Sequence, residues 1–269
     1  MRRPIYFLPH GGGPLPLMGH DGHRSLTAMM RGLGDEVAGS SAIIVVTAHW
    51  EEPVVTFSGS AHPSMLFDYY NFPPETYEYD YPAPGAPDLA REAQALLKNA
   101  GIKSAMNMDR GFDHGTFVPM MLIRPEADIP VLQMSLLASL DPADHIAVGK
   151  ALASLLDRNI TLIGSGLSFH NMAVLMRGQE TPAGEDKTFD AWLNETLTDS
   201  SLPETDREAH LAGWADAPGA RLCHPREEHL LPLHVCYGAA AAAGGQAETI
   251  FREPLMGSMT SSFCWQAQQ

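Results

Sequence analysis

The sequence predicts an α/β fold, in which a central, mostly parallel (mixed) β-sheet carries helices on both faces. Short runs rich in Val and Ile, without strict alternation of apolar and polar residues, are typical of strands covered on both faces. Segments with a helical pattern lie between these runs, and alternation of strands with helices favours a mostly parallel sheet. The length suits one large domain and no shift in composition marks a boundary, so residues 1–269 are expected to form a single domain.

The local patterns place the individual elements. Residues 87–100 begin with a proline and stop before Gly101, which predicts a helix. A second helix is expected over residues 141–158, with Asp141 as N-cap and Pro142 in the first turn. The Pro- and Tyr-rich tract 72–88 cannot be a regular helix; we expect a long loop over a binding site, with a plain surface crossing as the alternative. The expected strands are residues 5–8, 42–48, 53–58, 129–136 and 160–164.

Composition argues against several partners and settings. The formal net charge of −15 disfavours nucleic acids and anionic membranes, because both require basic patches. The three cysteines form no CxxC motif, which indicates a reduced, cytoplasmic setting. The first apolar run spans only about five residues, too short for a secretory signal. No apolar run approaches the roughly 20 residues of a membrane span, so we expect a soluble protein, as a monomer or small homo-oligomer.

The chain contains twelve histidines, and the positions of several predict a metal site. His10, His49 and His170 each follow a predicted strand. In open parallel sheets, ligands bind at the carboxyl ends of the strands, so these three side chains can converge there. Histidine is the commonest metal ligand and suits general base catalysis near neutral pH. His114, beside Asp113 in the motif GFDHG, is a fourth candidate. For each of these histidines taken singly, a structural role is the alternative.

The motif HPREEHLLPLH near the C-terminus adds His229 and His234. Five positions on a regular helix separate two side chains by about 140°, so only one of the two is expected to face the site. Glu227 and Glu228 precede His229, which leaves a carboxylate ligand as an alternative. Five other histidines have no such context and are expected on the surface: His20, His23, His62, His145 and His210.

The HGGGP turn after the first predicted strand does not match a phosphate-binding loop. It departs from GxGxxG and from the pattern ending in GK[ST], and no lysine precedes Lys98. The glycines can instead let the backbone and a bulky substrate approach a metal beside His10, with a flexible turn as the alternative. Ser165 and Ser168 lie near His170, but this segment lacks the GxSxG pattern of a serine nucleophile.

Several segments, taken in order and nearly from end to end, resemble those of the class III extradiol ring-cleavage dioxygenases, in the branch named for DOPA 4,5-dioxygenase. Each motif is weak by itself, and their common order makes the resemblance specific. The motifs are HGGGP, IIVVTAHW, FDYYNFPPETYEYDYPAPG, GFDHGTFVPM, LQMSL, IGSGLSFHN and HPREEHLLPLHV, and SMTSSF is similar to the closing strand of the family. The HGGGP turn is richer in glycine than the HGxP form usual in the family.

The resemblance implies a non-haem Fe(II) enzyme that uses O2 to cleave the aromatic ring of a catechol-type small molecule, DOPA-like or otherwise substituted. The product would be a muconic semialdehyde. His10, His49 and His229 would bind the iron, with His229 in the place that a glutamate fills in the protocatechuate-cleaving relatives.

The same resemblance assigns the remaining candidates. His170 would be the acid/base. His114, oriented by Asp113 or a backbone carbonyl, would hydrogen-bond the oxygens of the substrate or bound oxygen. The residues expected to support the ligands or to contact the substrate are His234, Asp113, Gly12 and Tyr81.

Two alternatives use the same histidines. Zn(II) can occupy such a site in isolated protein, and a zinc-dependent hydrolase would need neither O2 nor a reducible metal. A metal-binding protein without turnover is the other alternative, because a scaffold can keep a site without its chemistry. Dependence on oxygen separates the dioxygenase from both.

Overall fold

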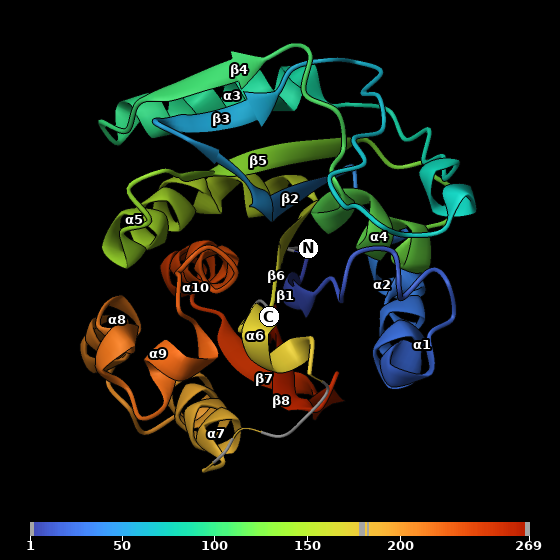
Figure 1. Ribbon diagram of the computed structural model, residues 1–269. Coiled ribbons are helices and arrows are strands. Elements are labelled where there is room, and N and C mark those ends of the chain that lie inside the picture. Colours follow the sequence, from blue (N-terminus) through green and yellow to red (C-terminus); the bar gives the residue numbers. More distant parts are fainter. Residues whose placement is uncertain (1–2, 178–180, 182, 267–269) are drawn as a thin grey trace.

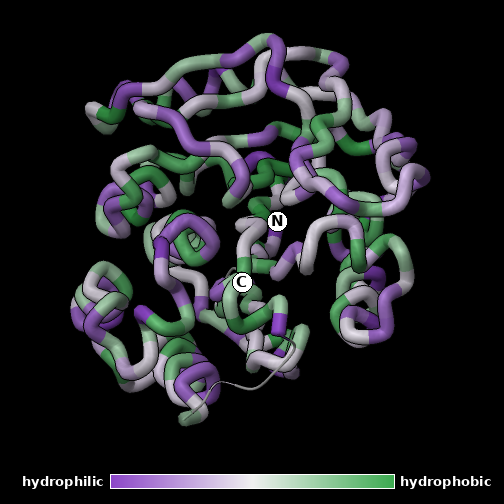
Figure 2. Tube along the Cα trace, viewed as in Figure 1, coloured by the Kyte–Doolittle hydropathy of each residue, from purple (hydrophilic) through white to green (hydrophobic). Residues whose placement is uncertain are grey.

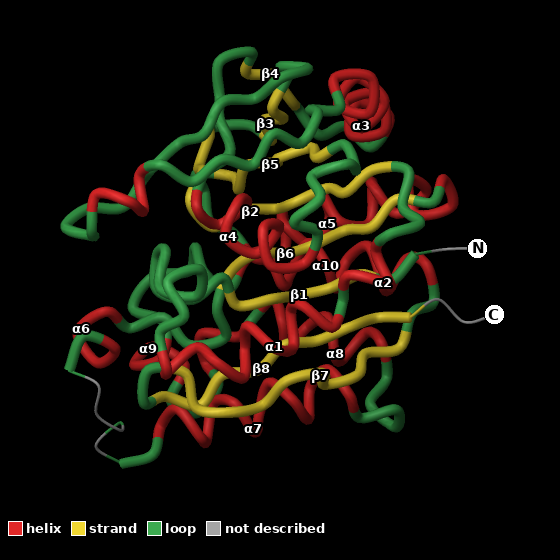
Figure 3. Tube along the Cα trace, turned by 90° about the vertical axis from the view of Figure 1, so that its right-hand side faces the viewer, coloured by secondary structure: helices red, strands yellow, loops and turns green. Residues whose placement is uncertain are grey.

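Eight strands form one sheet in the computed structural model, which describes residues 3–177, 181 and 183–266. The strands are β1 (Ile5–Pro9), β2 (Ala42–Glu52), β3 (Val55–Ser58), β4 (Ser104–Asn107), β5 (Val131–Leu137), β6 (Ile160–Gly166), β7 (Gln246–Leu255) and β8 (Ser258–Gln266). Their order is β4-β3-β5-β2-β6-β1-β8-β7 (Figure 1, Figure 3). The pairs β4–β3, β5–β2, β2–β6 and β6–β1 are parallel, whereas β3–β5, β1–β8 and β8–β7 are antiparallel. The predicted mixed, mostly parallel sheet is confirmed.

Helices cover both faces of this sheet. The α-helices are α1 (Arg24–Gly32), α2 (Gly34–Val37), α3 (Pro87–Asn99), α4 (His114–Ile123), α5 (Pro142–Leu152), α6 (Met172–Leu175), α7 (Glu185–Thr198), α8 (Glu204–Ala212), α9 (Ala220–Cys223) and α10 (Leu231–Ala243). Short 3-10 turns are η1 (Asp21–His23), η2 (Pro74–Tyr77), η3 (Ala153–Arg158) and η4 (Trp214–Asp216). Figure 1 shows α1, α2 and α4 on one side of the sheet and α5, α8 and α10 on the other.

The alternation of side chains along β2 explains this three-layer arrangement. Ile43 and Val45 are buried in a core with α1 and α4, whereas Ile44 and Val46 are buried in a second core with α5 and α10. Because successive side chains of a strand point to opposite faces, an unbroken apolar run needs cover on both sides. Figure 2 shows hydrophobic residues along the central strands.

The predicted elements are present, with differences at their ends. The expected strands correspond to β1, β2, β3, β5 and β6, and residues 87–100 correspond to α3. However, β2 continues to Glu52, so His49 lies within the strand and not after it. In the segment 141–158, the α-helix stops at Leu152 and continues as the 3-10 turns of η3, which end at Asn159 with a φ of 63°. The tract 72–88 contains only the short η2 before α3 begins.

Two histidines expected on the surface are buried, which corrects that prediction. The ring of His145 joins β5 to α5: its Nδ1 donates to the carbonyl of Asp141 at 2.7 Å, and its Nε2 accepts from the amide of Leu137 at 3.1 Å. His23 accepts the amide of Gly12 at 3.1 Å. Backbone partners allow these rings to be buried, because a buried polar group is tolerated when it is hydrogen-bonded. The surface positions expected for His20, His62 and His210 are confirmed.

Among the residues described, none of the helices combines the length and the apolar character needed to cross a membrane.

Candidate metal and catalytic site

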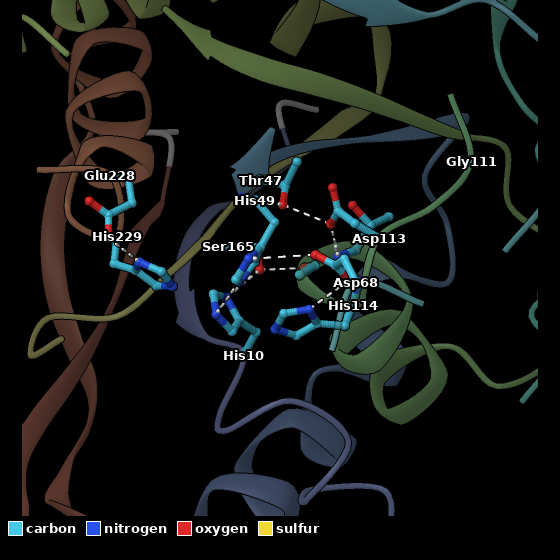
Figure 4. Close-up of polar contacts among 12 residues, drawn as sticks. His10, Thr47, His49, Asp68, Gly111, Asp113, His114, Ser165, Glu228 and His229 are labelled. Carbon is cyan, nitrogen blue, oxygen red and sulfur yellow. Dashed lines mark hydrogen bonds and ion pairs between the residues drawn. The ribbon is translucent and has the colours of Figure 1, made fainter. Parts of the chain in front are cut away.

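Five histidines from distant parts of the chain meet near the carboxyl ends of β1, β2 and β6. We call them the histidine cluster: His10, His49, His114, His170 and His229. His10 directly follows β1, and His49 lies near the end of β2. His114 is the first residue of α4, His170 follows β6, and His229 precedes α10. Figure 4 shows the rings of His10 and His49 between those of His114 and His229.

The rings of the histidine cluster lie within direct reach of one another. The centroids of His10 and His49 are 4.7 Å apart, and that of His229 lies 5.2 Å from His10 and 5.0 Å from His49. His114 lies 3.9 Å from His49, and His170 stacks on His229 with centroids 3.3 Å apart. The three predicted ligands, the predicted acid/base and the fourth candidate are therefore brought together. Two groups of three residues each have possible ligand atoms within 4.8 Å of one another. The first group is His10, His49 and His114, and the second is His170, Glu228 and His229.

Ser165 determines the orientation of His10. The Ser165 hydroxyl donates its proton to the carbonyl of Gly115, so its oxygen accepts from Nδ1 of His10 at 3.1 Å. Nδ1 of His10 thus carries the proton, and Nε2 presents a lone pair. This Nε2 faces Nε2 of His49 at 3.0 Å, a distance that suits either an N–H···N hydrogen bond or a cation bound by both nitrogens.

A carboxylate from the loop before η2 lies beside two further rings. Oδ1 of Asp68 accepts from Nδ1 of His114 at 2.8 Å, and Oδ2 lies 3.6 Å from Nδ1 of His49. The Asp68 carboxylate also accepts the backbone amide of His114 at 2.9 Å. Burial alone would raise the pKa of Asp68, but the hydrogen bonds from His114 hold it below its ordinary value. The ionised acceptor therefore turns Nε2 of His114 toward the cluster, and it places a negative charge beside Nδ1 of His49.

Asp113 has a different task from the one predicted. It caps the N-terminus of α4 by accepting the amide of Thr116, and it accepts the hydroxyl of Thr47 at 2.8 Å. Arg110 donates to its second oxygen at 2.8 Å. Burial raises the pKa of this carboxyl. The ring of His114 is thus oriented by Asp68 and not by Asp113 or a backbone carbonyl, and Asp113 supports the start of the helix that carries His114.

A second carboxylate holds the other two rings. Oε1 of Glu228 accepts from Nδ1 of His229 at 2.9 Å and lies 3.3 Å from Nδ1 of His170. Burial alone would raise the pKa of Glu228, but the hydrogen bonds from His170 and His229 hold it far below its ordinary value. The contact with His229 is drawn in Figure 4.

The donor set of the histidine cluster fits a divalent metal ion. Burial, reinforced by the neighbouring histidines, holds the pKa of His10 and His49 well below 6.5, and burial lowers that of His229 to about 3. These rings are therefore neutral at physiological pH, which is the form that binds a metal. Each also has its Nδ1 beside an acceptor, the arrangement typical of metal-binding imidazoles. Nitrogen donors of this kind are suitable ligands for both iron and zinc.

Three residues that were expected to support the ligands or contact the substrate make no described hydrogen bond to the rings of the histidine cluster. His234 is buried within α10, where its ring contacts the carbonyls of Leu211 at 2.9 Å and Leu230 at 3.2 Å. The hydroxyl of Tyr81 donates to the carbonyl of Arg124 at 3.1 Å. The amide of Gly12 donates to His23. The pair His229 and His234 thus behaves as its spacing predicted, with one ring in the cluster and the other in the core.

The HGGGP turn has a defined shape. Gly11 and Gly13 have φ values of 82° and 56°, which side chains rarely adopt. A Cβ at Gly12 would lie 3.1 Å from the sulfur of Met256, and one at Gly13 would lie 3.2 Å from the ring of Phe72. Gly11 and Gly13 are therefore required by the conformation of this turn, which the amide of Gly12 anchors to His23.

Sequence reasoning missed Asp68, Ser165 and the buried His224 as parts of this region. Asp68 lies in a motif that carries the family resemblance, but its spacing to His114 has no local pattern. Ser165, weighed above as a nucleophile, supports His10 and makes no described hydrogen bond to His170. Ser168 instead accepts the amide of Ser261 at 2.8 Å, and its carbonyl accepts Nε2 of His224 at 2.9 Å.

Comparisons with known proteins place the chain in a family. The family model described as the catalytic LigB subunit of aromatic ring-opening dioxygenase matches residues 5–263. The "Dioxygenase tasH" of Hapsidospora irregularis is 44% identical over 254 residues, covering 88% of this chain and 78% of that protein. The 4,5-DOPA dioxygenase extradiol of Beta vulgaris is 36% identical over 239 residues, covering 87% and 86%.

The structure of a bacterial protein gives the same result for the fold. The crystal structure of an uncharacterized protein from Escherichia coli K12 superposes with a TM-score of 0.77 at 28% identity, over 98% of this chain and 99% of that chain. With a family model matched over residues 5–263 and relatives of this similarity, the chain belongs to the class III extradiol ring-cleavage dioxygenases, the family of the LigB catalytic subunit.

Proposed function

We propose that this protein is an Fe(II)-dependent extradiol dioxygenase in which residues 1–269 form one catalytic domain. Its reaction is the cleavage of the aromatic ring of a catechol-type substrate by O2 to a muconic semialdehyde. One observation carries the proposal: the Nε2 atoms of buried, neutral imidazoles converge, with those of His10 and His49 3.0 Å apart. A divalent cation is the partner that this donor set fits.

His10, His49 and His229 are the proposed ligands. They come from three separate segments, and His229 lies on the side of the His10–His49 pair opposite His114 (Figure 4). This choice leaves His114 and His170 free to contact the substrate. When bound, Fe(II) would supply the redox chemistry that activates O2.

His170 is the proposed acid/base. With its Nδ1 directed at Glu228, its Nε2 can accept a proton from a substrate hydroxyl and later return it. Its side chain is 17% exposed, so a small molecule can reach it. His114, fixed by Asp68, presents Nε2 as a hydrogen-bond acceptor for a second hydroxyl.

Aromatic side chains beside the cluster support an aromatic substrate. The ring of Tyr69 lies 5.8 Å from that of His114 and 5.4 Å from that of Phe72. Aromatic rings pack favourably edge to face at such distances, and a planar substrate can join the same arrangement. The relatives named as 4,5-DOPA dioxygenase extradiol favour a catechol with a DOPA-like side chain.

The test uses protein freed of metal and reloaded with Fe(II) without oxygen. A panel of catechols that includes DOPA is added, air is admitted, and oxygen uptake is recorded together with visible absorbance. We expect a yellow semialdehyde to form with one O2 consumed per ring. His170→Gln, loaded with iron to the same level, is expected to lose about 10²- to 10⁴-fold of the rate, the contribution of a positioned acid/base.

The opposite result has a clear form. If no catechol consumes O2, while the Zn(II)-loaded protein hydrolyses test esters or amides, the histidine cluster serves a zinc hydrolase. If neither metal supports turnover, the protein is a metal-binding member of the family. Full oxygen uptake in His170→Gln would remove the acid/base role from that residue.

A further inference from the structure

We propose that Glu228 is a positioning residue shared by the third metal ligand and the acid/base. One of its carboxylate oxygens orients both His229 and His170, so that a single side chain couples metal binding to proton transfer. The inference rests on the proposed function for the roles of these two histidines. Its geometry stands independently of the substrate.

The two rings share one acceptor atom. Oε1 of Glu228 lies 2.9 Å from Nδ1 of His229 and 3.3 Å from Nδ1 of His170. The rings are stacked, with centroids 3.3 Å apart and planes inclined by 16°. Because the carboxylate only accepts, both Nδ1 atoms carry their protons and both Nε2 atoms are left as acceptors. A change in the position of Oε1 therefore acts on both rings together.

Through Arg226, the second oxygen of Glu228 connects the His170–His229 pair to β2, the strand that carries the proposed ligand His49. Nη1 of Arg226 lies 3.2 Å from Oε2 of Glu228. The same guanidinium holds Glu51 of β2 through two hydrogen bonds of 2.5 and 2.6 Å. Glu51 is two residues beyond His49 in β2. The bidentate contact of Arg226 with Glu51 is strongly directional, and its single contact with Glu228 links this carboxylate to the strand that carries His49.

These contacts also distinguish Glu228 from a metal ligand. Oε1 serves the two imidazoles and Oε2 serves Arg226, so both oxygens face partners of their own. The side chain is 12% exposed, which limits its exchange with water. A carboxylate placed behind an imidazole in this way raises the ligand strength of the imidazole and fixes its tautomer. The sequence alone leaves a carboxylate ligand open as an alternative, and these contacts argue against Glu228 in that role.

The chain offers a matched control one residue away. Glu227 pairs with Arg221 at 2.7 Å and makes no described contact with the histidine cluster. Glu228→Ala removes the shared acceptor, whereas Glu227→Ala removes a carboxylate of the same kind from the same segment. Glu228→Gln is intermediate, because its single amide oxygen can serve either Arg226 or the histidines, but not both.

Two readouts do not depend on turnover. The first is Zn(II) affinity, measured by competition with a chromophoric chelator. We expect Glu228→Ala to bind Zn(II) about 10- to 100-fold more weakly, the usual loss when the partner of a metal-binding imidazole is removed. The second is the ring tautomer of His170 in the Zn(II)-loaded protein, by nitrogen-15 NMR, with His170→Gln to assign the signal. We expect the Nδ1–H form in the wild type and in Glu227→Ala, and a shift toward the Nε2–H form in Glu228→Ala.

A third readout links the residue to the reaction. With Fe(II) held saturating, Glu228→Ala is expected to lower kcat more than it raises KM, whereas combining it with His170→Gln should cause little further loss of kcat. Glu228→Gln is expected to recover part of the affinity. Unchanged affinity and an unchanged His170 tautomer in Glu228→Ala would overturn the proposal. So would a loss of Zn(II) as complete as in His229→Ala without a tautomer change, because that result would make Glu228 a ligand.

Failure of the proposed function gives a different pattern. The wild type would then consume no O2, while Glu228→Ala would still weaken Zn(II) binding and shift the tautomer of His170. This result would support the shared positioning role of Glu228 and contradict the proposed dioxygenase reaction.

Discussion

At the scale of single residues, the chemistry of the histidine cluster depends on acceptors behind the rings. Nδ1 of His10 donates to the neutral hydroxyl of Ser165. Nδ1 of His49 lies beside the carboxylate of Asp68, and Nδ1 of His229 donates to the carboxylate of Glu228. A carboxylate partner makes an imidazole a stronger donor to a metal than a neutral partner does. We therefore expect His49 and His229 to contribute more to metal affinity than His10.

A ranking of alanine variants tests the choice of the third ligand. His229→Ala should lose metal almost completely at concentrations where the wild type is saturated, since it removes a direct nitrogen ligand. His114→Ala should lose much less, because its proposed partner is the substrate. His234→Ala is the buried control; the hydrogen-bond contacts described for its ring are with core carbonyls, so the metal content of this variant should be unchanged. Metal content after gel filtration, with circular dichroism for folding, gives the order. A larger loss in His114→Ala would make His114 the third ligand.

At the scale of elements, the end of β6 brings two proposed ligands together. The amide of His10 donates to the carbonyl of Gly166 at 3.2 Å, and the amide of Leu167 donates to the carbonyl of His229 at 2.9 Å. A Cβ at Gly166 would lie 2.1 Å from this carbonyl oxygen of His229. Only glycine permits that approach, so β6 positions β1 on one side and the segment before α10 on the other.

Gly166→Ala tests this packing. The added methyl should displace the backbone of His229, destabilise the protein by about 1–3 kcal/mol as overpacking does, and weaken Zn(II) binding by about tenfold or more, as lost support of a ligand does. Urea unfolding and chelator competition measure the two effects. Gly32→Ala, at the end of α1 where nothing lies within 4 Å of the new Cβ, is the control. Wild-type affinity in Gly166→Ala would show that the segment before α10 is positioned by other contacts.

At the scale of the whole molecule, many histidines are buried in neutral form. Burial lowers the pKa of His23 and His234 to about 4 and that of His224 to about 3, and it also lowers that of His145. The same holds for the proposed ligands, as described above. In the unfolded chain these groups titrate near 6.5. Below that pH the unfolded state binds protons that the native state does not, so stability falls as the pH falls.

Stability of the metal-free protein should therefore decrease steeply between pH 6.5 and 5, a window above the titration of ordinary carboxyl groups. Each buried histidine contributes about 1.4 kcal/mol per pH unit to the slope. Urea unfolding in the presence of a chelator at several pH values measures it. His234→Gln should flatten the slope by about one such contribution, whereas the exposed His210→Gln should not. A stability that does not change over this window would contradict the neutral burial of these rings.

The sequence by itself determined the class of fold, the main strands and the edge of the sheet at which the site lies. Apolar periodicity is a local property, and the rule that sites form at the carboxyl ends of parallel strands needs only the strand ends. His10, His49 and His170 can therefore be grouped from the sequence alone. The exposed edge strand β7 and the short β4 escaped prediction, because neither has the apolar run that marks a buried strand.

Only the tertiary structure decided which groups stand behind the rings. Asp68 and His114 are 46 residues apart, and Arg226 and Glu51 are 175 residues apart. No local pattern records such pairs, because a polar group is satisfied by whatever segment the fold brings beside it. The error over His23 and His145 has a different reason. Their backbone partners lie only 4 to 11 residues away, but the contact of a ring with a turn leaves no apolar or spacing pattern in the sequence. The histidines of the candidate site can thus be identified from the sequence, whereas the orientation of their rings depends on packing between distant segments.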